Sequence, residues 1–486
     1  MSPRFTVGPV FHIAGMLLAI LGIGMLIPAL VDAADHHPDW LAFVGGFACT
    51  LAVAGGLYLS TGGAQFERFT LKHTFLLTSL AWVILALFGA LPLMFSSLRL
   101  SFTDAYYEAM SGLSTTGATV IVGLDHAPAG VLLWRALLNW LGGVGIIVMA
   151  IAILPVLRVG GMQLFRSESS DRSDKVFSTV RDTAGAIGVT YVVLSLISAL
   201  LFHLAGMNWF DAICHAMGAV STGGFSTKDT SLGWYDSHAV LWAATVSMIF
   251  GALPLTYYIR LLRNFRATLL SDSQVITLVA ILAFAIASMT LWAWKMVGLP
   301  FWDSLSHSAM NVTSIITDCG FVSIDYSAWG GYAVAAFFVF YFIGGCTGST
   351  SGSVKVFRWQ ILVQSIATQM KQMVRPHQVV LLLYHGKVVE QDVIDSVINF
   401  VTAYILVFAA LTMVLAALGL DFLTASSAIA AALAGAGPGL GPVIGPAGNY
   451  QSLPDAAKWV LSAAMLLGRL EIFTVFVLFT RAFWKE

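Results

Sequence analysis

The stretch that decides the fold is Phe102-Thr-Asp-Ala-Tyr-Tyr-Glu-Ala-Met-Ser-Gly-Leu-Ser-Thr-Thr-Gly-Ala118, because a related stretch recurs further along the chain. The second copy reads Phe210-Asp-Ala-Ile-Cys-His-Ala-Met-Gly-Ala-Val-Ser-Thr-Gly-Gly-Phe225. Aligned on their Ala-Met pairs, the two copies superpose Gly117 on Gly224. A short helix followed by a glycine loop, used more than once, is the signature of an internal repeat.

Two weaker copies follow, one ending Thr317-Asp-Cys-Gly-Phe321 and the other Gly435-Ala-Gly-Pro-Gly439. Their Gly320 and Gly437 are the counterparts of the first two loop glycines. Each of the four segments lies between long apolar runs and is too short and too polar to cross a bilayer. We therefore interpret them as re-entrant segments, since non-helical backbone at membrane depth must line a cavity or be buried in protein. The alternative is a set of tight turns outside the membrane.

Composition places the chain among polytopic membrane proteins. Of its 486 residues, 58% are hydrophobic and 10% are charged, against about 25% charged in soluble domains. Several apolar runs exceed the roughly 20 residues that cross a bilayer, and the first is too long for a signal-peptide core and is taken as a retained helix. The predicted spans are 10–31, 40–61, 73–98, 131–157, 183–206, 238–262, 273–298, 330–345, 393–419 and 457–483.

The predicted fold is therefore an all-α polytopic membrane protein with ten spans. Four units of membrane helix, pore loop and membrane helix surround one pore, and the first two spans are an additional N-terminal pair. The corresponding division of the chain is 1–68 for the extension, then 69–165, 166–268, 269–388 (whose inner helix is interrupted) and 389–486 for the four units.

Charge placement predicts the orientation. Most of the 24 Lys and Arg residues fall on one side of the ten-span arrangement, which the positive-inside rule makes cytoplasmic. Both termini are then cytoplasmic, and all four re-entrant segments enter from outside. The residues on the cytoplasmic side are Arg4, Arg68, Lys72, Arg158, Arg166, Arg172, Lys175, Arg181, Arg260, Arg263, Arg266, Lys355, Arg358, Lys371, Arg375, Lys387, Arg481 and Lys485.

Four glycine loops that converge on one axis are suited to a cation pore. Backbone carbonyls can replace the hydration shell of a cation, and glycine accepts the backbone angles that point carbonyls inward. Threonine hydroxyls add oxygens, and proline stiffens the fourth loop. The predicted selectivity filter, which binds the permeating metal ion, consists of Thr115, Thr116, Gly117, Thr222, Gly223, Gly224, Asp318, Cys319, Gly320, Ala436, Gly437 and Pro438.

An aspartate opens each re-entrant segment. We predict that these residues cap the N-termini of the pore helices, so that each helix points its negative C-terminal end toward the pore and favours cations. The alternative is that they are surface caps without effect on permeation. The four residues are Asp104, Asp211, Asp303 and Asp421.

The eighth span contains a break that predicts a gate. A run with four glycines and four hydroxyl residues cannot form a stable lipid-facing helix and must face protein or water. Because it follows the third filter loop on the cytoplasmic side, we predict that it closes the pore from below; the alternative is a kink that serves helix packing. It lacks the GxxxxGK[ST] pattern of a phosphate-binding loop. Its residues are Gly344, Gly345, Cys346, Thr347, Gly348, Ser349, Thr350, Ser351 and Gly352.

Charged residues at membrane depth are functional candidates. Arg469 lies inside the last span, where it either places positive charge in the pore, holds the gate loop through carbonyl hydrogen bonds, or forms a buried ion pair with another unit. Glu471, two residues on, projects to a different side of the helix and is not its partner. Glu108 is predicted to brace the first filter loop, and His215 and His307 to be hydrogen-bonded core residues rather than ligands.

These loops resemble those of the Trk/Ktr/HKT superfamily of potassium transporters. The resemblance rests on Met110-Ser-Gly-Leu-Ser-Thr-Thr-Gly-Ala118, on the loops at 221–225 and 437–440, on Ile343-Gly-Gly-Cys-Thr-Gly-Ser-Thr-Ser-Gly-Ser-Val-Lys355 and on Met465-Leu-Leu-Gly-Arg-Leu-Glu-Ile-Phe-Thr474. The extra N-terminal helix pair is similar to the bacterial Trk membrane subunit (TrkH-like). Asp318-Cys319 departs from the threonines more common in the third loop of that family.

The resemblance implies potassium uptake through a channel-like path in the bacterial inner membrane. It also implies a homodimer with one pore per protomer, a cytosolic TrkA-like nucleotide-binding ring as partner, nucleotide only on that partner, and no covalent cofactor. In that family a glycine at the position of Gly117 favours potassium over sodium.

Two other classes compete with this interpretation. A secondary active carrier, coupling K⁺ to Na⁺ or H⁺, usually shows inverted or parallel repeats and midplane carboxylates. An intramembrane enzyme needs a nucleophile or metal set, and neither HExxH nor GxSxG occurs in the sequence. No basic arm indicates nucleic acid, so the expected surroundings are lipid and protein, and no enzyme activity is expected.

Overall fold

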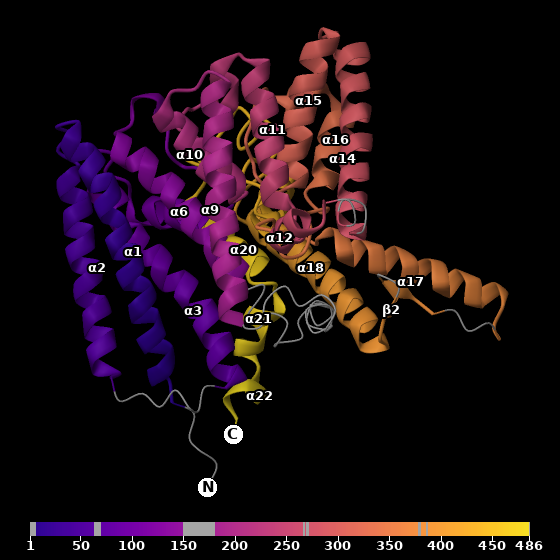
Figure 1. Cartoon of the computed structure of the whole chain (residues 1–486), viewed down its shortest axis with the longest axis horizontal. Coiled ribbons are helices and arrows are strands. Elements are labelled where there is room, and N and C mark those ends of the chain that lie inside the picture. Colours follow the sequence, from indigo (N-terminus) through magenta and orange to yellow (C-terminus); the bar gives the residue numbers. More distant parts are fainter. Residues whose placement is uncertain are drawn as a thin grey trace.

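The computed structural model of the chain is almost entirely helical (Figure 1) and describes residues 6–62, 70–148, 180–265, 268, 272–377, 381–384 and 387–485. The inner end of the predicted span 131–157 and the predicted boundaries at 68/69 and 165/166 lie outside these ranges. The first long helix begins, and the last short helix ends, at the same end of the molecule.

Among the described residues, six helical segments are long and apolar enough to cross a membrane. They are α1 (Gly8–Ala34), α2 (Trp40–Ser60), α3 (Leu71–Gly89) with α4 (Leu91–Phe95), α9 (Val180–Leu204), α14 (Ser273–Trp292) with the π-helical turn η5 (Ala293–Val297), and α18 (Gln391–Ala417). Two bent pairs raise the number to eight: α11 (His238–Ala252) with α12 (Leu255–Arg263), bent by 93°, and α20 (Asp455–Arg469) with α21 (Phe473–Phe476), bent by 105°.

The other two predicted spans are not among these helices. The fourth, α6 (Ala129–Val148), reaches the edge of the described range. The eighth, α16 (Gly331–Phe340), has only 10 residues, because the chain leaves the helix where the glycine and hydroxyl run begins. A polytopic, mostly helical membrane protein is thus the fold, with fewer uninterrupted spans than predicted.

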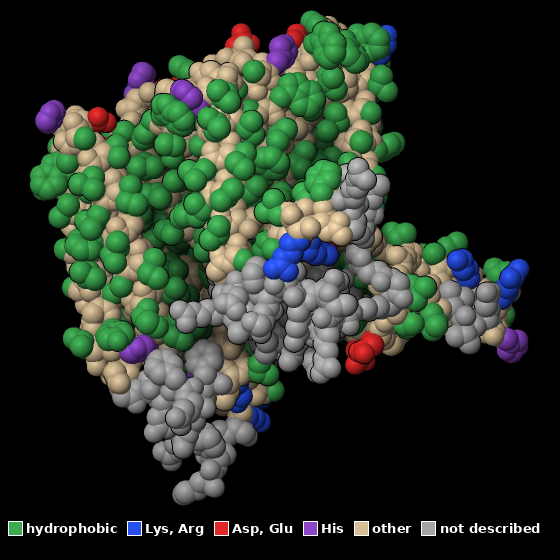
Figure 2. All heavy atoms as spheres, viewed as in Figure 1, with side chains coloured by type: hydrophobic (Ala, Val, Ile, Leu, Met, Phe, Trp, Pro, Cys, Tyr) green, Lys and Arg blue, Asp and Glu red, His purple; other side chains and the backbone are tan. Residues whose placement is uncertain are grey.

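The lateral surface of the molecule is apolar. Hydrophobic side chains cover the face seen in Figure 2, while histidine and acidic side chains gather mostly at its upper end and lysine and arginine mostly at its lower end. Individual residues on this surface are strongly exposed, such as Leu59 at 80%, Phe284 at 79% and Leu204 at 74%. A continuous exposed apolar surface of this kind is compatible with lipid rather than water.

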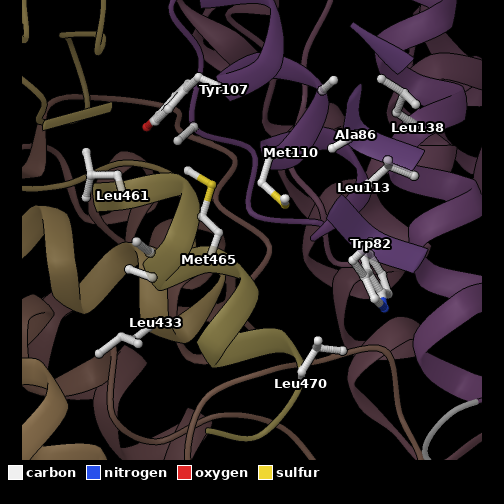
Figure 3. Close-up of a cluster of buried hydrophobic side chains, with 14 of the residues drawn as sticks. Trp82, Ala86, Tyr107, Met110, Leu113, Leu138, Leu433, Leu461, Met465 and Leu470 are labelled. Atoms are coloured by element: carbon white, nitrogen blue, oxygen red, sulfur yellow. The ribbon is translucent and has the colours of Figure 1, made fainter. Parts of the chain in front are cut away.

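Four short helices lie within this shell of spans and are largely buried along their length: α5 (Phe102–Leu113), α10 (Trp209–Val220), α15 (Phe301–Ile316) and α19 (Phe422–Ala434). They are the helices predicted for the re-entrant segments. Figure 3 shows how the first of them packs against the last unit: Met110 and Leu113 lie on one side of the cluster, and Leu461 and Met465 of α20 on the other.

The predicted aspartate caps are correct in only one of the four short helices. Asp421 caps α19 by accepting a hydrogen bond from the Thr424 backbone at 3.1 Å, and hydrogen bonds from Thr424 lower the pKa of the Asp421 carboxyl.

In α5 and α10 the caps are Ser101 and Asn208, and Pro300 precedes α15 without a side-chain cap. Asp104, Asp211 and Asp303 instead occupy the third helical position. They still stabilise the positive end of the helix dipole there.

The remaining elements are short or peripheral. Helix α17 (Val356–Val374) extends sideways from the bundle, next to a hairpin of two short strands (Figure 1). The others are η2 (Leu124–His126), η4 (Ser231–Tyr235), η6 (Tyr326–Trp329), β1 (Leu383–Tyr384), β2 (Lys387–Val388), η7 (Val477–Phe479) and α22 (Arg481–Trp484).

The N-terminal helix pair is attached to the first unit by buried carboxylates. Asp32 of α1 is fully buried, and its Oδ1 accepts a hydrogen bond from the Gly130 backbone at 2.6 Å, at the start of α6. Asp39, between α1 and α2, accepts hydrogen bonds from Ser97 through the backbone at 2.9 Å and the hydroxyl at 2.8 Å. A carboxylate at a helix N-terminus satisfies amides that have no partner within the helix.

Asp32→Ala is expected to lower the melting temperature of the detergent-solubilised protein, because it leaves a buried helix N-terminus without its acceptor. The cost of such an unsatisfied group is about 1–3 kcal/mol. Asp35→Ala, at an exposed position on the same helix end, is the matched control and should leave the melting temperature unchanged. Equal melting curves for the two variants would contradict a locking role for Asp32.

Candidate ion pathway

The four short helices end in the same turn. In each, a backbone N–H of the following loop donates to the carbonyl five residues earlier, which fixes how the loop leaves the helix. The four bonds are Thr116 to Ser111 at 2.8 Å, Gly223 to Gly218 at 2.8 Å, Cys319 to Ser314 at 2.8 Å and Ala436 to Ala431 at 2.9 Å. Thr116, Gly223, Cys319 and Ala436 are therefore structural equivalents.

On either side of this equivalent residue the backbone is left-handed. The residue before it has a φ of 53° at Thr115, 51° at Thr222, 60° at Asp318 and 83° at Gly435. The residue after it has a φ of 79° at Gly117, 68° at Gly224, 94° at Gly320 and 76° at Gly437. Residues with left-handed φ thus alternate with a residue of negative φ. This alternation turns successive peptide groups to the same side of the chain, whereas a regular strand turns them to opposite sides.

The loop glycines close the four loops into a ring. A β-carbon at any of them would approach a carbonyl oxygen of the neighbouring loop closer than 3.0 Å, which real β-carbons do not tolerate. The contacts run around the ring in order: Gly117 against Gly223, Gly224 against Cys319, Gly320 against Ala436, and Gly437 against Thr116. Glycine is therefore required here both for its φ and for the close approach of two backbones.

Gly437 is the equivalent of Gly117, as predicted, but the three residues predicted for the fourth loop are shifted by one relative to those of the other loops. The counterpart of Thr115 is Gly435, which the sequence prediction omitted, while Pro438 lies past the equivalent three residues. The Pro438 carbonyl accepts a hydrogen bond from the Tyr341 hydroxyl at 2.6 Å, and that of Gly437 accepts one from Tyr450 at 2.8 Å. Counting two residues back from the aligned glycine in all four loops would have found Gly435.

A buried ion pair braces the first loop from behind, as predicted for Glu108. Its carboxylate pairs with Arg135 of α6 at 2.8 Å and accepts the backbone N–H of Val120 at 2.9 Å. Arg135 also donates to the Ser226 carbonyl, past the second loop, at 2.7 Å. Both side chains of the pair are 1% exposed or less, so this one pair ties two loops to α6.

The other loops are braced by uncharged side chains, at the corresponding position in the second and third helices and one residue earlier in the fourth. His215 Nε2 bonds the Ser226 hydroxyl at 2.9 Å, and Asn311 accepts the Ser323 backbone N–H at 3.1 Å. Ser427 accepts the N–H of Leu440 at 3.0 Å. His215 is buried and hydrogen-bonded, as predicted. The same holds for the half-buried His307, whose Nδ1 lies 2.8 Å from the Ser323 hydroxyl.

The predicted gate segment lies in the break between α16 and α17 and is mostly buried. Thr350 Oγ1 donates to the last carbonyl of α10, Val220, at 2.9 Å and to Gly251 of α11 at 3.0 Å. The N–H of Ser353 donates to the last carbonyl of α19, Ala434, at 3.1 Å. The segment thus contacts the C-terminal ends of the short helices of the second and fourth units.

Two further side chains hold this segment. Arg469, which is 5% exposed, donates from Nη1 to the Thr350 carbonyl at 2.8 Å, the carbonyl hydrogen bond that was one of its three predicted roles. Asp318 of the third loop accepts a hydrogen bond from Ser351 at 2.7 Å. Glu471, which was expected not to pair with Arg469, pairs with Arg358 at 2.6 Å.

A ring of four backbone loops, enclosed by buried short helices inside an apolar shell, defines a mostly helical, polytopic class of membrane protein. The chain matches the TrkH family, described as a cation transport protein, over residues 41–485, and it belongs to this family.

Its relatives match over nearly their whole length. It is 43% identical to the Trk system potassium uptake protein TrkI of Halomonas elongata over 98% of this chain and 97% of the relative. It is 34% identical to the Trk system potassium uptake protein TrkH of Escherichia coli K12 over 98% and 99% of the two chains. The crystal structure of the potassium transporter TrkH from Vibrio parahaemolyticus superposes with a TM-score of 0.91 at 34% identity, covering 99% of this chain and 100% of that one.

Glu108→Gln is expected to destabilise the fold strongly, because it leaves the buried Arg135 cation without its partner. Breaking one side of a buried pair costs about 3–5 kcal/mol. Asp303→Asn on the equivalent helix α15, whose side chain is 40% exposed, should cost no more than about 1 kcal/mol. Chemical denaturation in detergent compares them, and similar midpoints would show that the Glu108 pair does not brace the loops.

Proposed function

We propose that the chain is a potassium-uptake subunit that conducts K⁺ in a channel-like manner through the ring of pore loops. The observation that carries this proposal is the closed order of glycine-to-carbonyl contacts around the four loops. Such a ring presents backbone oxygens from four directions, which is how carbonyl cages replace the hydration shell of K⁺. This proposal keeps the ten spans and the five divisions of the chain that were predicted from the sequence. They form one pore with an attached N-terminal pair of helices.

The proposed filter combines the predicted residues with the residue that the structure adds. The predicted ones are Thr115, Thr116, Gly117, Thr222, Gly223, Gly224, Asp318, Cys319, Gly320, Ala436, Gly437 and Pro438, and Gly435 joins them. K⁺ is the proposed substrate because the relatives above are potassium uptake proteins by name, and because all four loops keep the glycine.

The segment from Gly344 to Gly352 is proposed as the gate. It contacts the carbonyl ends of two short helices, the third loop and Arg469. A segment held by hydrogen bonds from several units can leave as one body when those bonds are exchanged for water. Its glycines and hydroxyls keep it from becoming a regular helix.

The proposed setting is the bacterial inner membrane, with both termini in the cytoplasm. The end of the molecule at which Figure 2 shows most lysine and arginine is then the cytoplasmic one. The proposed assembly is a homodimer with one pore per protomer, regulated by a cytosolic TrkA-like ring that binds the nucleotide. These assignments follow the resemblance and are tested by mass determination in detergent with and without that partner.

Gly117→Ser is expected to abolish growth of a potassium-uptake-deficient bacterium on low potassium and to reduce the preference for K⁺ over Na⁺. Its side chain would collide with the Gly223 carbonyl. Gly123→Ser is the matched control, because Gly123 has a similar φ of 83° but a β-carbon there would meet no atom beyond its chain neighbours within 4 Å. Failure of the unmodified chain to support growth, with its regulatory partner present, would contradict potassium as the substrate.

Thr350→Val is expected to raise passive cation leak about tenfold, because it removes the hydroxyl proton that the Val220 and Gly251 carbonyls share, a contact worth about 1.4 kcal/mol. Thr347→Val is the comparison in the same segment. The Thr347 hydroxyl has no hydrogen-bond partner among the described residues, so its loss should change the leak far less. The measurement is rubidium efflux from loaded proteoliposomes. Equal leaks in both variants would show that these bonds do not hold the pore closed.

A further inference from the structure

The innermost layer of the loop ring is not uniform. The residues two positions before the glycines share the same left-handed turn, and they are Thr115, Thr222, Asp318 and Gly435. Two of them bring a hydroxyl, one has no side chain, and one brings a carboxylate. Asp318 is therefore the one ionisable side chain in this layer, next to the segment proposed as the gate.

The Asp318 carboxylate is buried but only partly satisfied. The residue is 1% exposed, and Oδ2 accepts the Ser351 hydroxyl at 2.7 Å. Ser351 Oγ in turn accepts the N–H of Gly345 at 2.8 Å, so its proton is directed at the carboxylate. Oδ1 has no hydrogen-bond partner among the described residues, although the Gly352 amide lies nearby. An ionised oxygen in such a place needs a cation or further donors.

The positive charges near Asp318 do not pair with it directly. Arg469 and Lys355 are close enough to act on its charge. Arg469 donates from Nη1 to the Thr350 carbonyl, while its Nε and Nη2 are buried without a partner among the described residues, and Lys355 lies 3.9 Å from Glu471. Neither forms an ion pair with Asp318 within the described part of the chain. The carboxylate thus offsets positive charge at this level of the pore without being neutralised by direct contact.

We propose that Asp318 is a cation ligand: its carboxylate forms an anionic site at the inner end of the loop ring, which Ser351 covers while the gate segment is in place. The inference rests on the proposed function and adds a charged side chain to a filter otherwise built from neutral oxygens. Thr115, whose Oγ1 is also buried without a partner in the described residues, belongs to the same layer and offers a second oxygen. Withdrawal of Ser351 would free Oδ2 for the passing ion.

A purely structural role, in which Asp318 serves only as a latch that holds Ser351 by a hydrogen bond, does not explain why this residue is a carboxylate. A threonine at this position, as in the first two loops, could accept the Ser351 hydroxyl equally well. The latch therefore does not require a charge, whereas a cation site does. The carboxylate is also placed where the helix ends of α10 and α19 already favour positive charge.

The test is Ba²⁺ block of radioactive rubidium uptake into proteoliposomes of the full chain, with Ba²⁺ on both faces. Barium has about the size of potassium and twice its charge, so its binding responds strongly to one carboxylate. Asp318→Thr, which copies Thr115 and Thr222 at the same turn, should weaken the block about tenfold, and Asp318→Glu should retain most of it. Ser351→Ala removes the latch but keeps the charge, and should retain the wild-type barium sensitivity whatever its effect on the uptake rate.

Each result decides the matter. Unchanged block in Asp318→Thr, equal weakening in Asp318→Thr and Ser351→Ala, or a wild type insensitive to Ba²⁺ would overturn the cation site. Loss of rubidium uptake by the wild-type chain would instead count against the proposed function. Folding of Asp318→Thr is checked by its melting temperature, and Asp318→Asn is the second neutral variant if that variant does not fold.

Discussion

The rest of the structure depends on one constraint, the approach of each loop glycine to a carbonyl of the next loop. Four such contacts join the loops into a closed ring, and a β-carbon at any of the four glycines would push two neighbouring loops apart. The constraint determines what surrounds the ring. Each short helix must end at the same level, and each loop must leave it through the same bond to the carbonyl five residues earlier. Left-handed residues on both sides of that bond then follow from the geometry of the chain.

The braces behind the loops show how four different sequences meet the same constraint. Behind the first loop a carboxylate–guanidinium pair supplies the bonds, behind the second an imidazole, behind the third an amide and behind the fourth a hydroxyl. Each of these groups joins the segment that follows the loop to the short helix that precedes it. Of these four groups the first is a charged pair, and its Arg135 also reaches across to Ser226 and so serves two loops. A buried pair that makes several hydrogen bonds compensates its desolvation better than an isolated one.

Much of this could be predicted from the sequence, and the failures have physical reasons. Apolar runs and the loop glycines are local patterns, so the helical class, the four short helices with their glycine loops and the break after α16 followed from them. Three of the four aspartate caps failed because the N-cap positions, Ser101, Asn208 and Pro300, lie three residues before the aspartates, which depends on how the chain enters the helix. Gly435 was missed although Gly437 was aligned correctly, because the three residues predicted for the fourth loop began at Ala436 instead of two residues before the glycine. The three options for Arg469 could be separated only by the position of Thr350, which lies far from it in sequence.

The break in the third unit becomes intelligible when the other three are compared with it. In those units a glycine of the following helix, Gly142, Gly251 or Gly468, passes so close to a carbonyl at the end of the short helix that a β-carbon there would collide with it. The inner helices are thereby drawn in beneath the ring, and those of the second and fourth units bend sharply just beyond that point. The third unit leaves its helix at Phe340 instead and sends a loop into the space that the others surround. Its partners there come from the second unit through Val220 and Gly251, from the fourth through Arg469, and from the third unit itself through Asp318. The four units are therefore not identical where they meet, because the third one contributes both the loop and the carboxylate that the loop contacts.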